Sequence, residues 1–255
     1  MKTAVTKGKD GAARPGEPHT GAMKRIALIE DDADIAYTIR LNLRKEKRYQ
    51  VEHYVSGLAA LAAVQEKPFD LVILDLNLPD IDGLALCREL RRADETRKVP
   101  TIMLTARVEE RDKLLGFEIG ADDYITKPFS IREFRSRVKA LLRRAAIPPP
   151  SARRDETIDH GDLRIDVRRR AVEVRGEPVQ LTFVEFELLA LLAGSPGVVW
   201  TRRQLLERLR GGADYREPRT IDVHVRHLRE KIEARPHEPE LILTVRGVGY
   251  RYRDR

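Results

Sequence analysis

Apolar and polar residues alternate with a regular rhythm from Lys24 onward. The short apolar runs RIALI, YQVEHYV, FDLVILD, VPTIMLT and DYITK have the length and composition of strands. Between and after them lie segments with helical spacing, such as ADIAYTIRLNLRKE, GLALCRELRRA and IREFRSRVKALLRR. Five strands that alternate with helices of about 10 to 15 residues predict an α/β fold with a five-stranded, doubly wound parallel sheet over residues 23–145.

The pattern changes on both sides of this region. Residues 1–22 have no apolar periodicity and predict a disordered N-terminal extension. Because a strand pattern begins at Met23, we expect Met23 to be a candidate start of translation. The segment 146–157 contains three consecutive prolines and predicts a linker. After it, residues 158–255 combine alternating short strands with helices and end in a strand–turn–strand, which predicts an α+β domain.

Three helices are marked in this second domain. Thr182 with Glu185, and Thr201 with Gln204, have the spacing of capping boxes. A third helix carries an apolar stripe at helical spacing, formed by Ile221, Val225, Leu228 and Ile232. Two short helices, a helix with basic residues and the hairpin TVRGVGYRYR predict a winged helix-turn-helix, in which Gly247 and Gly249 permit a tight turn.

The composition limits the class of protein but does not indicate a binding partner. The chain carries 48 Lys and Arg against 41 Asp and Glu, a net charge of +7. In the second domain, 19 Lys and Arg stand against 16 Asp and Glu, so net charge is no argument for nucleic acid binding. No apolar run approaches the roughly 18 residues of a membrane span. A single cysteine, Cys87, suits a reducing cytoplasm.

Carboxylates end two of the predicted strands. Asp75 follows the buried run LVIL, and Glu30, Asp31 and Asp32 follow RIALI. Carboxylates that converge at one edge of a sheet repel one another unless a cation lies between them, and oxygen ligands favour Mg²⁺. The alternative is a solvated acidic rim that caps the next helix.

Two later strand ends favour a phosphoryl site. Thr105 ends one apolar strand, and Lys127 follows another. A hydroxyl and an ammonium beside Mg²⁺ would stabilise a phosphoryl group on Asp75, which would act as the nucleophile. A cis peptide bond between Lys127 and Pro128 would turn the ammonium inward.

The motifs LIEDD, LDLNLPDIDGL, TIMLTAR and GADDYITKPF resemble the flavodoxin-like (CheY-like) receiver domain of bacterial two-component response regulators. Residues 23–255 as a whole resemble the OmpR/PhoB family. The resemblance implies that Asp75 accepts a phosphoryl group and that Asp31, Asp75 and the carbonyl of Asn77 bind Mg²⁺, with Glu30 acting through water. It gives Thr105, Lys127 and Tyr124 the roles of switch hydroxyl, phosphoryl-binding ammonium and mobile aromatic ring. The resemblance gives Asp32 no role in binding the metal ion, unlike Glu30 and Asp31.

The same resemblance implies a dimer on phosphorylation. Cross-subunit ion pairs would join Lys113 to Glu133 and Asp123 to Arg137, as a two-fold interface requires. For DNA it places the helix of residues 219–233 in the major groove and the hairpin in the minor groove. The candidate DNA contacts are Arg202, Arg203, Arg219, Thr220, Val223, His224, Arg226, His227, Arg246 and Gly247. His227 stands where PhoB-like members have a base-reading arginine.

The function expected from this reading is phosphorylation-controlled transcription regulation. A sensor histidine kinase would donate the phosphoryl group, and the chain would not be a turnover enzyme. Operator DNA with direct repeats and RNA polymerase would be further partners, the latter through the loop of residues 210–218. Two alternatives are an output domain that binds protein instead of DNA, and a DNA binder that ignores phosphorylation.

Overall fold

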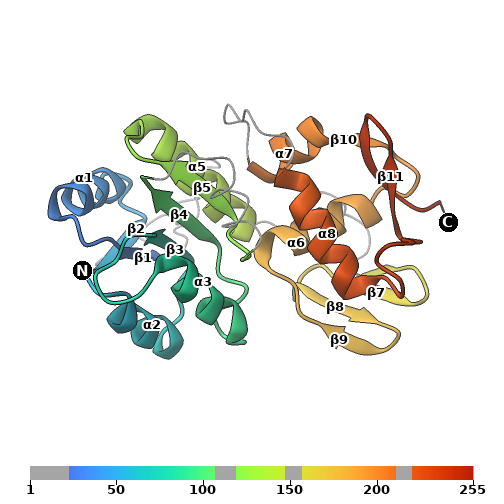
Figure 1. Cartoon of the computed structure of the whole chain (residues 1–255), viewed down its shortest axis with the longest axis horizontal. Coiled ribbons are helices and arrows are strands. Elements are labelled where there is room, and N and C mark those ends of the chain that lie inside the picture. Colours follow the sequence, from blue (N-terminus) through green and yellow to red (C-terminus); the bar gives the residue numbers. More distant parts are fainter. Residues whose placement is uncertain (1–22, 107–118, 147–156, 211–219, 255) are drawn as a thin grey trace, which may run out of the picture.

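A computed structural model describes residues 23–106, 119–146, 157–210 and 220–254. They form two domains side by side (Figure 1). The first ends with α5 and the second starts with β6, and they are called receiver and output domain after the expectation from the sequence. Several predictions fall outside the described residues. They are the extension 1–22, most of the linker, nearly all of the loop 210–218, Lys113 and Arg219.

The receiver is built on a parallel sheet in the order β2-β1-β3-β4-β5, which confirms the predicted fold class. Its strands are β1 (Lys24–Ile29), β2 (Tyr49–Tyr54), β3 (Leu71–Asp75), β4 (Thr101–Thr105) and β5 (Asp123–Thr126). Its helices are α1 (Ala33–Arg44), α2 (Gly57–Glu66), α3 (Gly83–Arg92) and α5 (Ile131–Ala146).

Alternate residues of the strands enter two apolar layers. On one face, Ile26 and Leu28 of β1 pack with side chains of α1 and α5. On the other, Ala27 and Ile29 join a cluster, here called the α2–α3 cluster, that includes Ala60 of α2 and Leu86 of α3. Because both faces are covered, β3 and β4 are buried throughout.

Over its described residues, the output domain combines two antiparallel sheets with three helices. A four-stranded sheet contains β6 (Thr157–Asp159), β7 (Leu163–Asp166), β8 (Ala171–Val174) and β9 (Glu177–Val179). The helices are α6 (Phe183–Ala193), α7 (Arg202–Arg210) and α8 (Thr220–Ile232). A second sheet joins β10 (Trp200–Thr201), β12 (Gly249–Tyr252) and β11 (Ile242–Val245) in that order. This arrangement confirms the winged helix-turn-helix.

The local signals that start these helices are confirmed. Thr182 and Glu185 form a complete capping box at α6. At α7, the Thr201 hydroxyl accepts the Gln204 amide at 3.1 Å, and Gln204 accepts the Thr201 amide at 2.9 Å. The predicted apolar stripe of α8 is buried along its length.

The two wing glycines have different roles. Gly247 has φ +74°, a conformation that L-residues rarely adopt, so it permits the turn as predicted. Gly249 was assigned to the same turn, but its φ is not positive. A Cβ there would lie 2.0 Å from the Trp200 carbonyl oxygen. Gly249 therefore allows β12 to approach β10, a long-range requirement that the local sequence did not reveal.

No helix among the described residues is both long enough and apolar enough to span a membrane.

Candidate functional site

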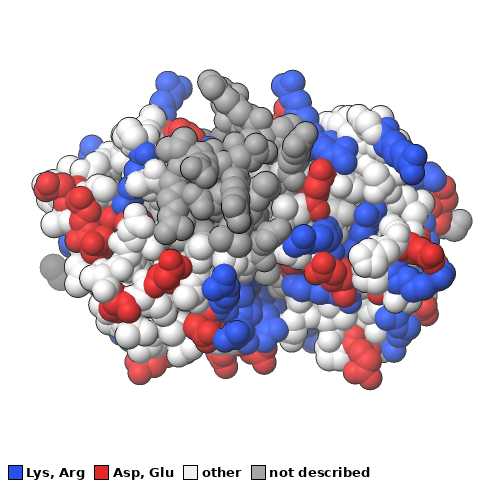
Figure 2. Space-filling view, viewed as in Figure 1, with Lys and Arg blue, Asp and Glu red and all other residues white. Residues whose placement is uncertain are grey.

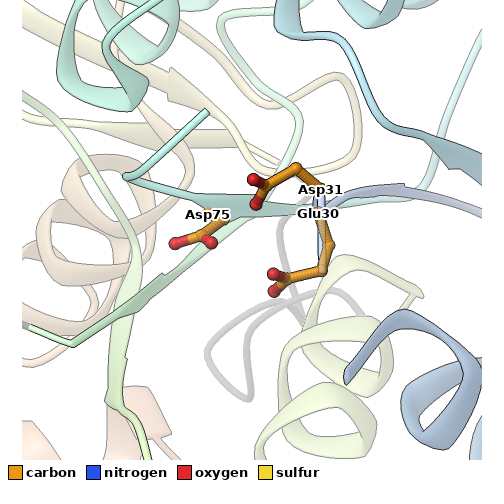
Figure 3. Close-up of side chains that lie close together, drawn as sticks. All are labelled: Glu30, Asp31 and Asp75. Atoms are coloured by element: carbon orange, nitrogen blue, oxygen red, sulfur yellow. The ribbon is translucent and has the colours of Figure 1, made fainter. Parts of the chain in front are cut away.

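The acidic residues predicted to converge do so at the carboxyl ends of β1 and β3. Glu30 and Asp75 are buried, and Asp31 is exposed. The nearest carboxylate oxygens of the three lie within 4.8 Å of one another. In Figure 3, Asp31 and Glu30 reach toward Asp75 from the end of the neighbouring strand. Parallel pairing of β1 with β3 brings these ends together.

Lys127 is the cation of this cluster. Its ammonium donates to Asp75 Oδ2 at 2.8 Å and to the Glu30 carboxylate at 2.8 Å. The Lys127–Pro128 peptide bond is cis, as predicted. Thr105 is fully buried at the end of β4, and its carbonyl accepts the Lys127 amide. Lysine and hydroxyl thus stand at the same edge of the sheet as the carboxylates.

The charge of the cluster is not balanced by Lys127. Burial raises the pKa of Glu30 to about 7, although the hydrogen bond from Lys127 opposes this. The neighbouring Asp75 carboxylate raises this pKa further. One ammonium against three carboxyl groups leaves room for a further cation. The all-oxygen donor set fits a hard divalent ion such as Mg²⁺.

The other residues assigned to this site lie around it. Asn77 is exposed two residues after Asp75, and its amide donates to Asp75 Oδ1 at 3.3 Å. Tyr124 of β5 is a buried member of the α2–α3 cluster, so its ring does not lie on the surface. Asp32 accepts the amides of Asp34 and Ile35 at 2.9 Å each. It therefore caps α1, in line with its omission from the metal ligands.

Two residues that fix the loop after Asp75 were not singled out from the sequence. A Cβ on Gly83 would lie 2.4 Å from the Asp75 carbonyl oxygen, so only glycine lets α3 start this close to β3. Asp80 accepts hydrogen bonds from the Ser56 hydroxyl and from the amides of Gly57 and Leu58, which lowers its pKa to about 2. The LPDIDG motif contains both residues. The partners of Asp80 lie 22 to 24 residues away in the sequence, and the close approach at Gly83 depends on how α3 packs against β3.

The three candidate dimer residues that the structure describes, Asp123, Glu133 and Arg137, are paired within the chain. Arg137 donates to Asp123 at 2.8 Å and also to Glu133, one turn away on α5. The side chains of Arg137 and Asp123 are buried. The cross-subunit pair between Asp123 and Arg137 would therefore have to replace an internal one.

The candidate DNA contacts divide by the faces of α8. Arg226 is exposed, and Val223 and His227 are half-buried on its outer side. Thr220 and His224 are buried, because His224 falls in the same inward stripe as Ile221 and Val225. Both side chains are therefore covered in this arrangement, and their contact with DNA stays a prediction. Arg246 and Gly247 are exposed at the tip of the wing.

The two candidate DNA-contacting arginines of α7 differ. Arg203 is highly exposed and forms an ion pair with Glu207, one turn further along α7. Arg202 donates to Asp222 of α8 at 2.7 Å, and Tyr250 of β12 donates to the same oxygen at 2.8 Å. The Arg202 guanidinium also lies 5.0 Å from the centre of the Tyr250 ring. Arg202 therefore ties α7, α8 and the wing together.

Comparison with known proteins agrees with this geometry. Residues 26–139 match the family model described as response regulator receiver domain, and residues 176–252 match transcriptional regulatory protein, C terminal. The chain therefore belongs to the response regulators with a receiver and a C-terminal DNA-binding domain. Within them it is of the OmpR/PhoB type, the phosphorylation-controlled transcription regulators of two-component systems. The resemblance stated from the motifs is confirmed.

Similar proteins cover nearly the whole chain. The sensory transduction protein RegX3 of Mycolicibacterium smegmatis is 43% identical over 230 residues, which span 90% of this chain and 99% of that protein. RegX3 of Mycobacterium tuberculosis has the same identity and coverage. Two solved mutants of RitR are 32% identical, with TM-scores of 0.73 and 0.76, and cover 91% of this chain and 100% of theirs.

Proposed function

We propose that Asp75 is the phosphoacceptor and that a sensor histidine kinase is the phosphoryl donor. The observation that carries this proposal is the 2.8 Å contact between the Lys127 ammonium and Asp75 Oδ2 beside Glu30 and Asp31. Lys127 orients one oxygen of the buried Asp75 carboxylate. The two neighbouring acidic side chains complete a set of oxygen ligands for a divalent cation.

The transfer follows from these positions. An Asp75 oxygen attacks the phosphorus of the donor phosphohistidine, and the P–N bond breaks as the P–O bond forms. Lys127 pairs with one phosphoryl oxygen, and the Thr105 hydroxyl donates to another. Glu30, Asp31, Asp75 and the Asn77 carbonyl would hold Mg²⁺, which neutralises charge on the transferring group. The chain accepts one phosphoryl group and has no turnover substrate.

The output follows from the second domain. Phosphorylation would favour a symmetric receiver dimer, in which Asp123 exchanges its internal Arg137 partner for the Arg137 of the second subunit. Two output domains would then bind direct repeats in operator DNA. Val223, Arg226 and His227 would face the bases, and Arg203 and Arg246 the backbone and minor groove. RNA polymerase would be the next partner.

The test is phosphorylation by acetyl phosphate followed by DNA selection. With Mg²⁺, the wild-type mass should rise by one phosphoryl group, and Asp75→Asn should show no rise. Asp32→Asn, which alters only a helix cap, should still be modified. DNA fragments enriched by the phosphorylated protein should lose binding on Arg226→Ala. If modification occurs but no DNA sequence is enriched, a protein-binding output replaces the DNA-binding one. Equal enrichment without phosphate would point to a regulator that ignores phosphorylation.

A further inference from the structure

A buried carboxylate of the receiver contacts the first turn of an output helix. Asp122, which directly precedes β5, accepts the backbone amide of Val184 in α6 at 3.1 Å through Oδ1. Its other oxygen accepts the Thr101 amide at 2.8 Å and the Arg91 guanidinium at 2.8 Å. The Asp122 side chain is inaccessible to solvent. One carboxylate therefore joins the start of β4, the end of α3 and the output domain.

The position of Val184 in its helix makes this contact effective. Val184 is the second residue of α6, so its N–H has no acceptor within the helix. Thr182 already accepts the amide of Glu185. Asp122 thus supplies the missing acceptor and a negative charge at the positive end of the helix. In effect, the receiver completes the cap of an output helix.

The same contact brings the outer face of α8 against the receiver. Val223 of α8 packs against the α2–α3 cluster, whose buried members all belong to the receiver. Beside it, Ile119 and Gly120 of the receiver and His227 and Lys231 of α8 line one cavity of about 370 Å³. In Figure 2, basic side chains gather over the end of α3, close to this boundary. Val223 and His227, one turn apart, are two of the three side chains assigned to base contacts.

We propose that the receiver and operator DNA compete for this face of α8. In the closed form the receiver covers Val223, and the Asp122–Val184 contact, here called the latch, holds this form. The inference rests on the proposed function, because it takes α8 as the DNA-reading helix. A duplex cannot reach Val223 while the α2–α3 cluster covers it. DNA binding then requires that the Asp122–Val184 hydrogen bond be broken.

The contact is also placed to respond to Asp75. Two hydrogen bonds join Asp122 to Thr101 at the start of β4. The Asp122 amide donates to the Thr101 carbonyl at 3.0 Å, and the Asp122 carboxylate accepts the Thr101 amide. The other end of β4 is Thr105, and β5 carries Tyr124 two residues after Asp122. A phosphoryl group that draws Thr105 toward Asp75 shifts the two strands from which Asp122 extends. This gives phosphorylation a route to the output domain within one chain.

The contact itself is tested by hydrogen exchange at single amides of the full chain. The Val184 amide should be protected without phosphate and should exchange at least about tenfold faster with beryllofluoride and Mg²⁺, because its only acceptor leaves. The Phe186 amide, which donates to the Thr182 carbonyl within α6, should keep its protection and serves as the internal control. Unchanged Val184 exchange, in a chain whose Thr105 amide responds to the analogue, would overturn the latch.

Competition is tested with variants that do not touch Asp75. Ile119→Ser weakens the receiver side of the boundary, and Asp122→Asn removes the charge of the latch. Each unphosphorylated variant should bind the selected DNA about tenfold tighter than the wild type. Asp122→Asn weakens a hydrogen bond by removing the charge of its acceptor, and Ile119→Ser removes apolar packing at the boundary. Leu61→Ser is the matched control, since Leu61 of α2 packs on the same cluster. It should leave DNA affinity unchanged.

The outcomes separate this inference from the proposed function. Tighter binding by Ile119→Ser, with Leu61→Ser unchanged, supports the inference even if Asp122→Asn fails to fold. Wild-type affinity of a folded Ile119→Ser variant would overturn competition. If no variant in any state binds DNA, the proposed function fails. Exchange at Val184 then still decides whether the receiver releases α6.

Discussion

The ammonium of Lys127 lies 2.8 Å from the carboxylate of Asp75, although 52 residues separate them in the sequence. The contact arises because β3, β4 and β5 are parallel neighbours, so their carboxyl ends meet at one edge. The charges of the buried carboxylates Asp75 and Glu30 are therefore partly offset by one side chain, that of Lys127.

Lys127→Met should destabilise the chain by about 3 kcal/mol, since removing one partner of a buried ion pair leaves uncompensated charge. The loss should be measured by urea unfolding in EDTA. Mg²⁺ should restore more stability to this variant than to the wild type, because a bound cation takes over the neutralisation. Lys139→Met, on the exposed side of α5, is the control and should change neither quantity. Equal losses in the two variants would contradict this account of Lys127.

Gly83→Ala should lower stability by about 1–3 kcal/mol, because the new methyl group meets backbone atoms of Asp75 and Leu76 that cannot move aside. It should also slow phosphorylation by acetyl phosphate, since the Asp75 loop must shift. Gly57→Ala is the comparison. Its obstacles are the ends of the Ile81, Leu78 and Leu86 side chains, which can rotate away, so its cost should be smaller. Thermal unfolding of both variants gives the order, and the reverse order would refute the argument.

Asp80 should make stability depend on acidity. Its pKa falls from the ordinary 3.8 to about 2 through hydrogen bonds from Ser56, Leu58 and Gly57. A carboxyl group with a lowered pKa in the folded state stabilises above its unfolded pKa, and this is lost as pH falls from about 4 through 2. Asp80→Ala should therefore be less stable than the wild type at pH 7, and the difference should shrink below about pH 4. Unfolding curves across this range test it. A difference that stays constant with pH would exclude the linkage.

Arg202 and Arg203 should behave differently although they are adjacent. Arg203→Ala should leave stability unchanged and reduce the slope of log affinity against log salt by about 1, as expected for a lost phosphate contact. Arg202→Ala should lower stability by about 1–3 kcal/mol, because Asp222 loses a charged partner. Thermal unfolding and DNA titration at several salt concentrations distinguish the two. Equal salt slopes for both variants and the wild type would remove Arg203 from the DNA interface.

Much of the fold could be predicted from short stretches of sequence. Strand and helix patterns are local, so the alternation from Lys24 predicted the parallel sheet, and the boxes at Thr182 and Thr201 marked two helix starts. The convergence of Glu30, Asp31, Asp75 and Lys127 was also predictable, because parallel strands align their carboxyl ends. The inward direction of His224 followed from the same periodicity as its buried neighbours, yet it was grouped with the DNA contacts.

The rest depended on contacts between distant segments. Asp80 and Gly249 have partners 24 and 49 residues away, and no local pattern identifies them. The sequence by itself determined the two domains and the chemistry of the acidic site, since both depend on periodicity and residue type. Only the tertiary structure decided that Asp122 joins α6 and that Arg202 holds the wing. Such hydrogen bonds depend on how whole elements pack, which is a property of the assembled chain.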